Sequence, residues 1–164
     1  MRKKLIIALW AIAVLMMFTF GWGKERPKVT IQVLLSTPTQ SELAAVKAQA
    51  AEQRDFRKLE VNLRLDDSKS AVDRKLEIPD LSAIVNRYDQ TRVIAGSAFQ
   101  QNNIGSEAYA IHEQSVIFDA TGLDQESIRS IFRSSYVTVS WSSKEGQRSV
   151  SEASIGNLMT VQKE

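Results

Sequence analysis

The side chains that could do chemistry in this chain are one histidine and a few clusters of acidic and hydroxyl residues. His112 is the only histidine, so a site that needs two histidines cannot form within one chain. Glu113 follows it on the same predicted strand, and consecutive strand side chains point to opposite faces. Geometry therefore disfavours a direct dyad, and we interpret His112 as a half-exposed strand residue.

The acidic and hydroxyl clusters also lack the spacing of a known site. Asp66, Asp67 and Asp73 are the densest acidic group, but the ligand intervals and turn glycine of a calcium loop are missing. We interpret them as a solvated turn. Five serines gather without a glycine-framed nucleophile elbow, so serine hydrolysis would have to use His112 alone. These serines are Ser134, Ser135, Ser140, Ser142 and Ser143.

Glycine and cysteine usage excludes further classes of chemistry. The 7 glycines build neither a P-loop nor a dinucleotide fingerprint, and the absence of cysteine excludes disulfides, thiol catalysis and cysteine-ligated metals. We therefore predict no catalytic residue, no cofactor-binding residue and no metal ligand. A glycosidase-type pair of carboxylates needs no sequence motif, because the two side chains meet only in the fold. A small envelope hydrolase acting through carboxylates is the alternative function.

The segment Leu5–Trp22 has the composition of a membrane-spanning helix. It carries no charge, and its 18 residues would extend roughly 27 Å as a helix, close to a hydrocarbon core of about 30 Å. The sequence then divides into a short basic tail (1–4), a transmembrane signal anchor (5–22), a charged juxtamembrane linker (23–28) and an extracytoplasmic domain (29–164).

Two fates fit this segment, a retained anchor or a signal peptide that is cleaved near Gly23 and releases the domain. The positive-inside rule does not clearly decide the orientation of this segment, because three basic residues precede it and three closely follow it. The free amino terminus favours an N-terminus inside and a domain outside.

The charge of the chain depends on this N-terminal segment. Residues 1–23 hold three of the 21 basic residues and none of the 19 acidic ones, which leaves the remainder at a formal net charge of −1. A nucleic-acid-binding domain would need a basic face, so we predict no nucleic-acid partner. A chain without cysteines or Asn-x-Ser/Thr sequons suits the bacterial cell envelope.

The first half of the domain shows two clear strands. Residues 29–36 and 59–65 alternate between apolar and polar side chains, the period of a half-buried strand. Between them, Thr39 and Glu42 have the spacing of a capping box that opens a helix over 40–56. We expect a β-α-β unit with parallel strands and a right-handed crossover, followed by a weaker strand that ends at Ile78.

The second half repeats this order. Pro79 and Asp80 open a second helix, and 109–119 reads as a strand. Asp124 is a good N-cap for a helix over 125–134. Three short strands are expected after it, a hairpin over 137–151 that turns at Lys144-Glu145-Gly146, and a final strand near Val161.

The expected fold class is α+β, with a mixed sheet and helices on one face in a small sandwich. A ferredoxin-like topology and two β-α-β-β units (29–78 and 116–151) both agree with the element order. The expected function is a single-pass, membrane-anchored envelope protein whose domain binds a protein partner or ligand without catalysis.

Overall fold

The computed structural model describes residues 27–46, 54–66, 71–89, 91–101 and 108–162. The predicted anchor at 5–22 lies outside the described residues. Among those that are described, no helix has both the length and the apolar composition needed to cross a bilayer.

The described strands form two sheets, which we call the large sheet and the small sheet. The large sheet has the strand order β4-β5-β2-β1-β8. Its strands are β1 (Lys28–Ser36), β2 (Phe56–Asp66), β4 (Val93–Gln101), β5 (Tyr109–Asp119) and β8 (Thr160–Val161). β8 runs parallel to β1, whereas the other neighbours are antiparallel. The predicted α+β class with a mixed sheet is therefore confirmed.

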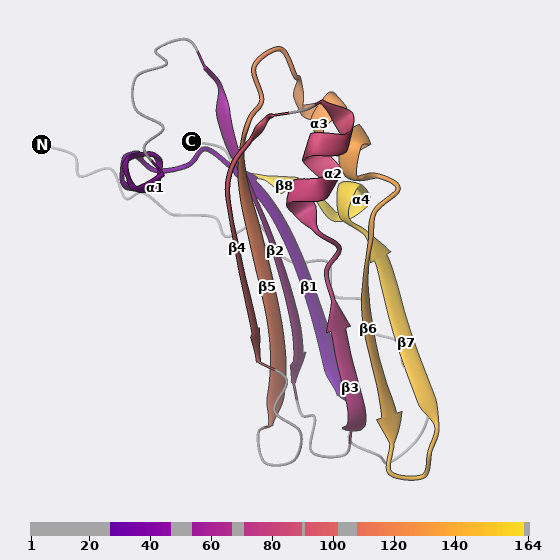
Figure 1. Cartoon of the computed structure of the whole chain (residues 1–164). Coiled ribbons are helices and arrows are strands. Elements are labelled where there is room, and N and C mark those ends of the chain that lie inside the picture. Colours follow the sequence, from indigo (N-terminus) through magenta and orange to yellow (C-terminus); the bar gives the residue numbers. More distant parts are fainter. Residues whose placement is uncertain (1–26, 47–53, 67–70, 90, 102–107, 163–164) are drawn as a thin grey trace, which may run out of the picture.

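The small sheet has the order β3-β6-β7, with antiparallel neighbours. Its strands are β3 (Ala71–Glu77), β6 (Tyr136–Ser143) and β7 (Arg148–Ser154). The helices are α1 (Gln40–Ala45), α2 (Leu81–Tyr88), α3 (Gln125–Phe132) and α4 (Ile155–Leu158). In Figure 1 the small sheet lies beside one half of the large sheet. The helices α2, α3 and α4 gather near the opposite end of the large sheet.

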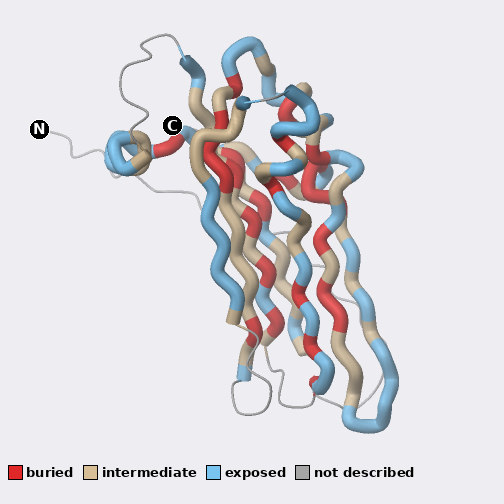
Figure 2. Tube along the Cα trace, viewed as in Figure 1, coloured by how far each residue is buried: buried red, intermediate tan, exposed pale blue. Residues whose placement is uncertain are grey.

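One hydrophobic core joins both sheets to the helices α2, α3 and α4. On the central strand β2, Leu59, Leu63 and Leu65 are fully buried, and they alternate with polar residues on the opposite, outer face. The facing strands and helices contribute the rest of this core, which appears as the red segments in Figure 2. The helical and C-terminal contributions are Leu81, Val85, Ile128, Phe132, Ile155 and Met159.

Local sequence signals placed the helix starts correctly. The capping box of α1 is present, with the Thr39 side chain accepting from the Glu42 backbone N–H. Asp80 and Asp124 cap α2 and α3 by accepting from the N–H groups of Ala83 and Ser127. These local hydrogen bonds satisfy backbone donors that a helix start leaves unpaired.

The predicted parallel β-α-β unit is wrong. β1 and β2 are antiparallel neighbours, with Val33 opposite Val61 and Leu35 opposite Leu59. A parallel crossover usually needs a helix that packs on the sheet. The helix α1 ends at Ala45 and buries no residue, so it cannot serve as that crossover.

The larger topological expectations also need correction. The order strand, helix, strand, strand does occur twice, but β1 and β2 pair with each other whereas β5 and β6 belong to different sheets. This pairing matches neither a ferredoxin-like sheet nor two equivalent β-α-β-β units. The expectation of helices on one face holds for α2, α3 and α4, which share the core. It fails for α1, which contacts the outer face of the large sheet through Glu42 and Lys58.

Candidate functional site

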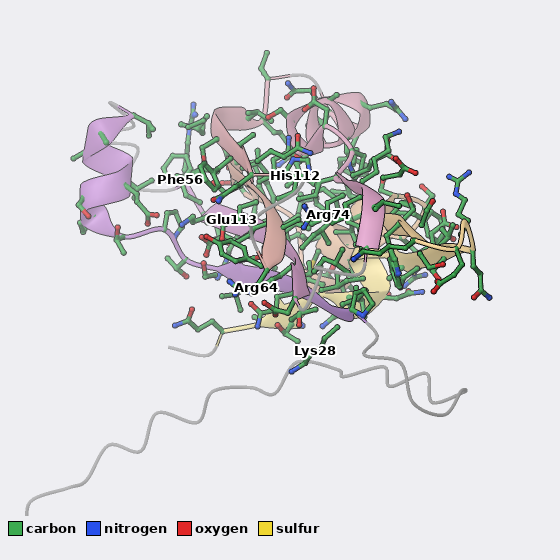
Figure 3. All side chains as sticks on the ribbon, turned by 90° about the horizontal axis from the view of Figure 1, so that it is seen from below. Lys28, Phe56, Arg64, Arg74, His112 and Glu113 are labelled. Atoms are coloured by element: carbon green, nitrogen blue, oxygen red, sulfur yellow. The ribbon has the colours of Figure 1, made fainter. Side chains whose placement is uncertain are left out.

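His112 connects the two sheets. It lies on the core side of β5, and its Nδ1 is 2.9 Å from the backbone oxygen of Leu76 on β3. A carbonyl only accepts, so Nδ1 is the donor in this bond. Gln100 on β4 donates more weakly to the same oxygen, at 3.4 Å. Figure 3 shows His112 with its strand neighbour Glu113. This histidine has a structural contact that accounts for its position.

Glu113 points to the outer face of the large sheet, as the alternation predicted. Its Oε1 accepts from Nδ2 of Asn62 on β2 at 2.8 Å, while His112 reaches across to the small sheet. The expectation that the two side chains lie on opposite faces is confirmed. They do not form a dyad.

The acidic cluster does not converge on a cation. Asp66 is bound by Arg64 at 2.8 Å, and Asp73 occupies an irregular position of β3 with a φ of 51°. Asp67 lies outside the described residues. Within the described ranges, no three acidic, histidine or cysteine side chains are grouped so that they could hold a metal ion.

The serine-rich stretch is used for backbone turns. The Ser143 hydroxyl accepts from the N–H groups of Glu145 and Gln147 in the β6–β7 hairpin. Ser135 bonds the backbone of Phe132 and Ile155, where α3 leads into β6. Ser140 is buried within the small sheet. The described contacts of these serines are structural.

A small ionic cluster holds α1 against β2. Nζ of Lys58 is 2.7 Å from a carboxylate oxygen of Glu42 and 2.7 Å from one of Glu60. The hydrogen bond from Lys58, together with those from Thr39, lowers the pKa of Glu42 from 4.5 to about 2. Desolvation lowers the pKa of Lys58, but the two carboxylates outweigh that effect, so the net direction is upward. Glu42 and Lys58 are therefore both charged near neutral pH.

Glu42→Gln should make the domain less stable near neutral pH and leave its stability almost unchanged in acid. The folded-state pKa is below the ordinary value, so the contribution is complete above pH 4.5 and disappears as the pH falls toward about 2. The Glu42 side chain is 33% exposed, and solvent screening limits the effect to about 1 kcal/mol. Urea unfolding of both proteins across this pH range measures it.

The control is Glu77→Gln, which alters a more exposed pair with Lys75. This change should cost less than about 0.5 kcal/mol. Equal losses for the two variants, or a loss for Glu42→Gln that persists in acid, would contradict the role of this cluster.

Two other carboxylates are stabilised in their ionised form. Burial alone would raise the pKa of Asp119, but hydrogen bonds from Thr121 and the charges of Arg54 and Arg92 hold it below its usual value. Hydrogen bonds from Ser127 lower the pKa of the helix cap Asp124. A general acid of the glycosidase type needs the opposite direction, a raised pKa.

The edges of the sheets are where the structure offers a binding surface. Edge strands expose unpaired backbone groups, and proteins usually shield them with charges, bulges or shortness. β8 has only 2 residues. β3 has an irregular register between Val72 and Lys75, and its Leu76 carbonyl is covered by His112. β4 and β7 are the remaining edge strands, and the register shift of β4 is confined to its start, between Val93 and Ala95.

β4 is the edge without charged shielding. Its sequence VIAGSAFQQ contains no charged residue and no proline. The backbone N–H of Asp119 donates to Arg92, so every second residue of β5 from Asp119 faces β4. A register shift between Val93 and Ala95 pairs these β5 residues with Ala95, Ser97 and Phe99. The backbone groups of Gly96, Ala98 and Gln100 therefore point away from β5. Phe99 on this strand is 54% exposed. The arrangement suits the addition of an extended peptide as a further strand.

Residues 91–99 fit a strand and a loop equally well, so the amino-acid sequence alone does not reveal this surface. The uncharged run over 93–101 was the available signal. Only the strand order shows that this run lies at an edge.

Comparisons with protein-family models, with curated proteins and with solved structures gave no significant match to this chain.

Proposed function

We propose that this chain is a single-pass membrane protein of the bacterial cell envelope whose domain binds a protein partner without catalysing a reaction. Residues 5–22 are the signal anchor, with the N-terminus inside and the domain at 29–164 outside. Secretion after cleavage near Gly23 is the alternative fate. The length and uncharged composition of the segment support the membrane location.

The open edge of β4 is the observation that carries the binding role. An extended segment of the partner would pair with the outward backbone groups of Gly96, Ala98 and Gln100, and Phe99 would supply apolar contact. Main-chain hydrogen bonds provide affinity in this mode, and neighbouring side chains provide specificity. The pKa values of Glu42, Asp119 and Asp124 are shifted downward, which makes these three carboxyl groups unsuited to be the general acid of the hydrolase alternative.

Photo-crosslinking in intact cells tests the proposal. A photoreactive phenylalanine analogue at Phe99 of the full chain should capture one distinct envelope protein. The matched control places the same analogue at Tyr88, an aromatic residue on α2 with a similar exposure of 56%. Equal capture at the two positions, or capture only of a second copy of this chain, would contradict a partner at β4.

A second variant examines the mode of binding. Ala98→Pro removes a backbone N–H that points away from β5, so the internal ladder stays intact while an added strand loses a donor and meets the proline ring. Capture at Phe99 should fall by about tenfold or more, the loss that one backbone hydrogen bond and a steric conflict predict. Thermal unfolding of the variant verifies that the domain is folded. Unchanged capture would rule out strand addition.

A further inference from the structure

The other long edge, β7, differs from β4 in its charge pattern. Arg148, Val150 and Glu152 alternate with Ser149 and Ser151 along the strand, and all three lie exposed on the outer face of the small sheet. Val150 is 58% exposed, the most exposed of the large hydrophobic residues that the structure describes. β7 forms the outer boundary of the small sheet in Figure 1.

The backbone of β7 presents the same three residues to the free side. In the β6–β7 hairpin, Ser143 N–H donates to the carbonyl of Gln147, so Gln147 faces β6. The direction alternates along an antiparallel strand. The N–H and C=O groups of Arg148, Val150 and Glu152 therefore point outward, where a further strand could pair with them.

The two charges are unmatched within the described part of the domain. Neither Arg148 nor Glu152 forms an ion pair there. They are four positions apart on an extended strand, which separates their Cα atoms by about 13 Å and prevents them from pairing with each other. They stand at equal distances on either side of Val150, with opposite signs.

We propose that β7 pairs with β7 of a second copy of this chain, antiparallel and with Val150 at the two-fold axis. In this register Arg148 of each copy lies opposite Glu152 of the other, and the two Val150 side chains meet between the ion pairs. The outward groups of these residues form about six backbone hydrogen bonds. The two small sheets become one continuous sheet.

The symmetry of the charge pattern on β7 is the reason to expect a second copy of this chain as the partner. An isologous interface must be complementary to itself, so each charge must meet its opposite after a two-fold rotation. The strand from Arg148 to Glu152 satisfies this condition in one register, and cross-strand ion pairs and β-branched pairs stabilise an antiparallel ladder. β4 has no charge that would select a register. This proposal does not depend on the proposed function of β4.

Site-specific cross-linking tests the register directly, because the chain has no native cysteine. Across the axis, two Val150 Cα atoms would be about 5.5 Å apart, within the range that a disulfide spans. Val150→Cys in the full chain, held in detergent, should therefore form a covalent dimer on oxidation. Arg148→Cys would lie about 13 Å from its counterpart and should stay monomeric. Equal cross-linking of the two variants would overturn the register.

Charge exchange separates this interface from any other contact between copies. In the Val150→Cys background, Arg148→Glu places like charges opposite each other twice, and cross-linking should slow by about tenfold. Adding Glu152→Arg restores opposite charges and should restore the rate. The proposal would be overturned if Arg148→Glu left the cross-linking rate unchanged. It would also be overturned if the variant with both Arg148→Glu and Glu152→Arg cross-linked as slowly as the one with Arg148→Glu alone. Loss of partner capture at Phe99 would not, since that result concerns β4.

Discussion

Phe118→Ala is expected to lower the free energy of unfolding by about 3–5 kcal/mol. Phe118 lies on β5, is fully buried, and is one of the largest side chains in the core shared by the two sheets. Removing its ring loses apolar burial and leaves a cavity that the neighbouring strands cannot fill. A domain of this size is stable by about 5–15 kcal/mol, so the variant should be close to unfolding at moderate temperature.

Urea unfolding followed by tryptophan fluorescence measures this loss. Phe99→Ala provides a control with the same chemical change, because Phe99 lies on the neighbouring strand β4 but is 54% exposed. Its removal should change the free energy of unfolding by less than about 1 kcal/mol. Similar losses for both variants would mean that the core is not organised around β5.

Gly156→Ala is the second substitution with a large expected effect, a loss of about 1–3 kcal/mol. A Cβ at Gly156 would lie 2.4 Å from the backbone oxygen of Arg129 and 2.8 Å from the backbone of Arg133. Both contacts are backbone atoms of the α3 segment and cannot rotate away as a side chain would. The short helix α4 would have to shift, and with it the buried residues Ile155 and Met159.

Thermal unfolding of this variant should be compared with Asn157→Ala. Asn157 is the next residue of α4 and is exposed, and its backbone N–H, which the substitution keeps, donates to the hydroxyl oxygen of the helix cap Ser154. The control should therefore stay within about 0.5 kcal/mol of the parent. A Gly156→Ala protein as stable as the control would show that α4 does not pack closely on α3.

The helix caps and most strand positions, though not that of β4, could be predicted from local sequence. The strand at 109–119 has the predicted bounds, and Thr39, Asp80 and Asp124 cap their helices as expected. These features depend on side-chain alternation and on hydrogen bonds within a few residues, which sequence spacing specifies directly. Chain direction and sheet membership do not have such a local signal.

The pairing of β1 with β2 illustrates this difference. Alternation identified Val33 and Val61 as core positions, and the structure places them opposite each other. The same pattern arises in parallel and antiparallel strands, so it could not give the direction. The direction was inferred from a helix that was expected to reach Phe56, whereas α1 ends at Ala45 without a buried face.

Recognising either proposed binding surface, β4 or β7, requires both the local sequence and the place of the strand in its sheet. The uncharged run over 93–101 and the opposite charges of Arg148 and Glu152 are properties of the sequence alone. Their meaning depends on β4 and β7 being edge strands, because a central strand has no backbone groups to offer.

The chemistry of the chain shows the same division. Composition alone excluded a two-histidine or cysteine-based site, since the required atoms are missing within the chain. The tertiary structure decided that His112 binds the backbone of Leu76 on the other sheet, a contact between residues 36 positions apart. Such contacts follow from how whole sheets pack, and packing is set by the combined burial of many distant side chains rather than by any local pattern.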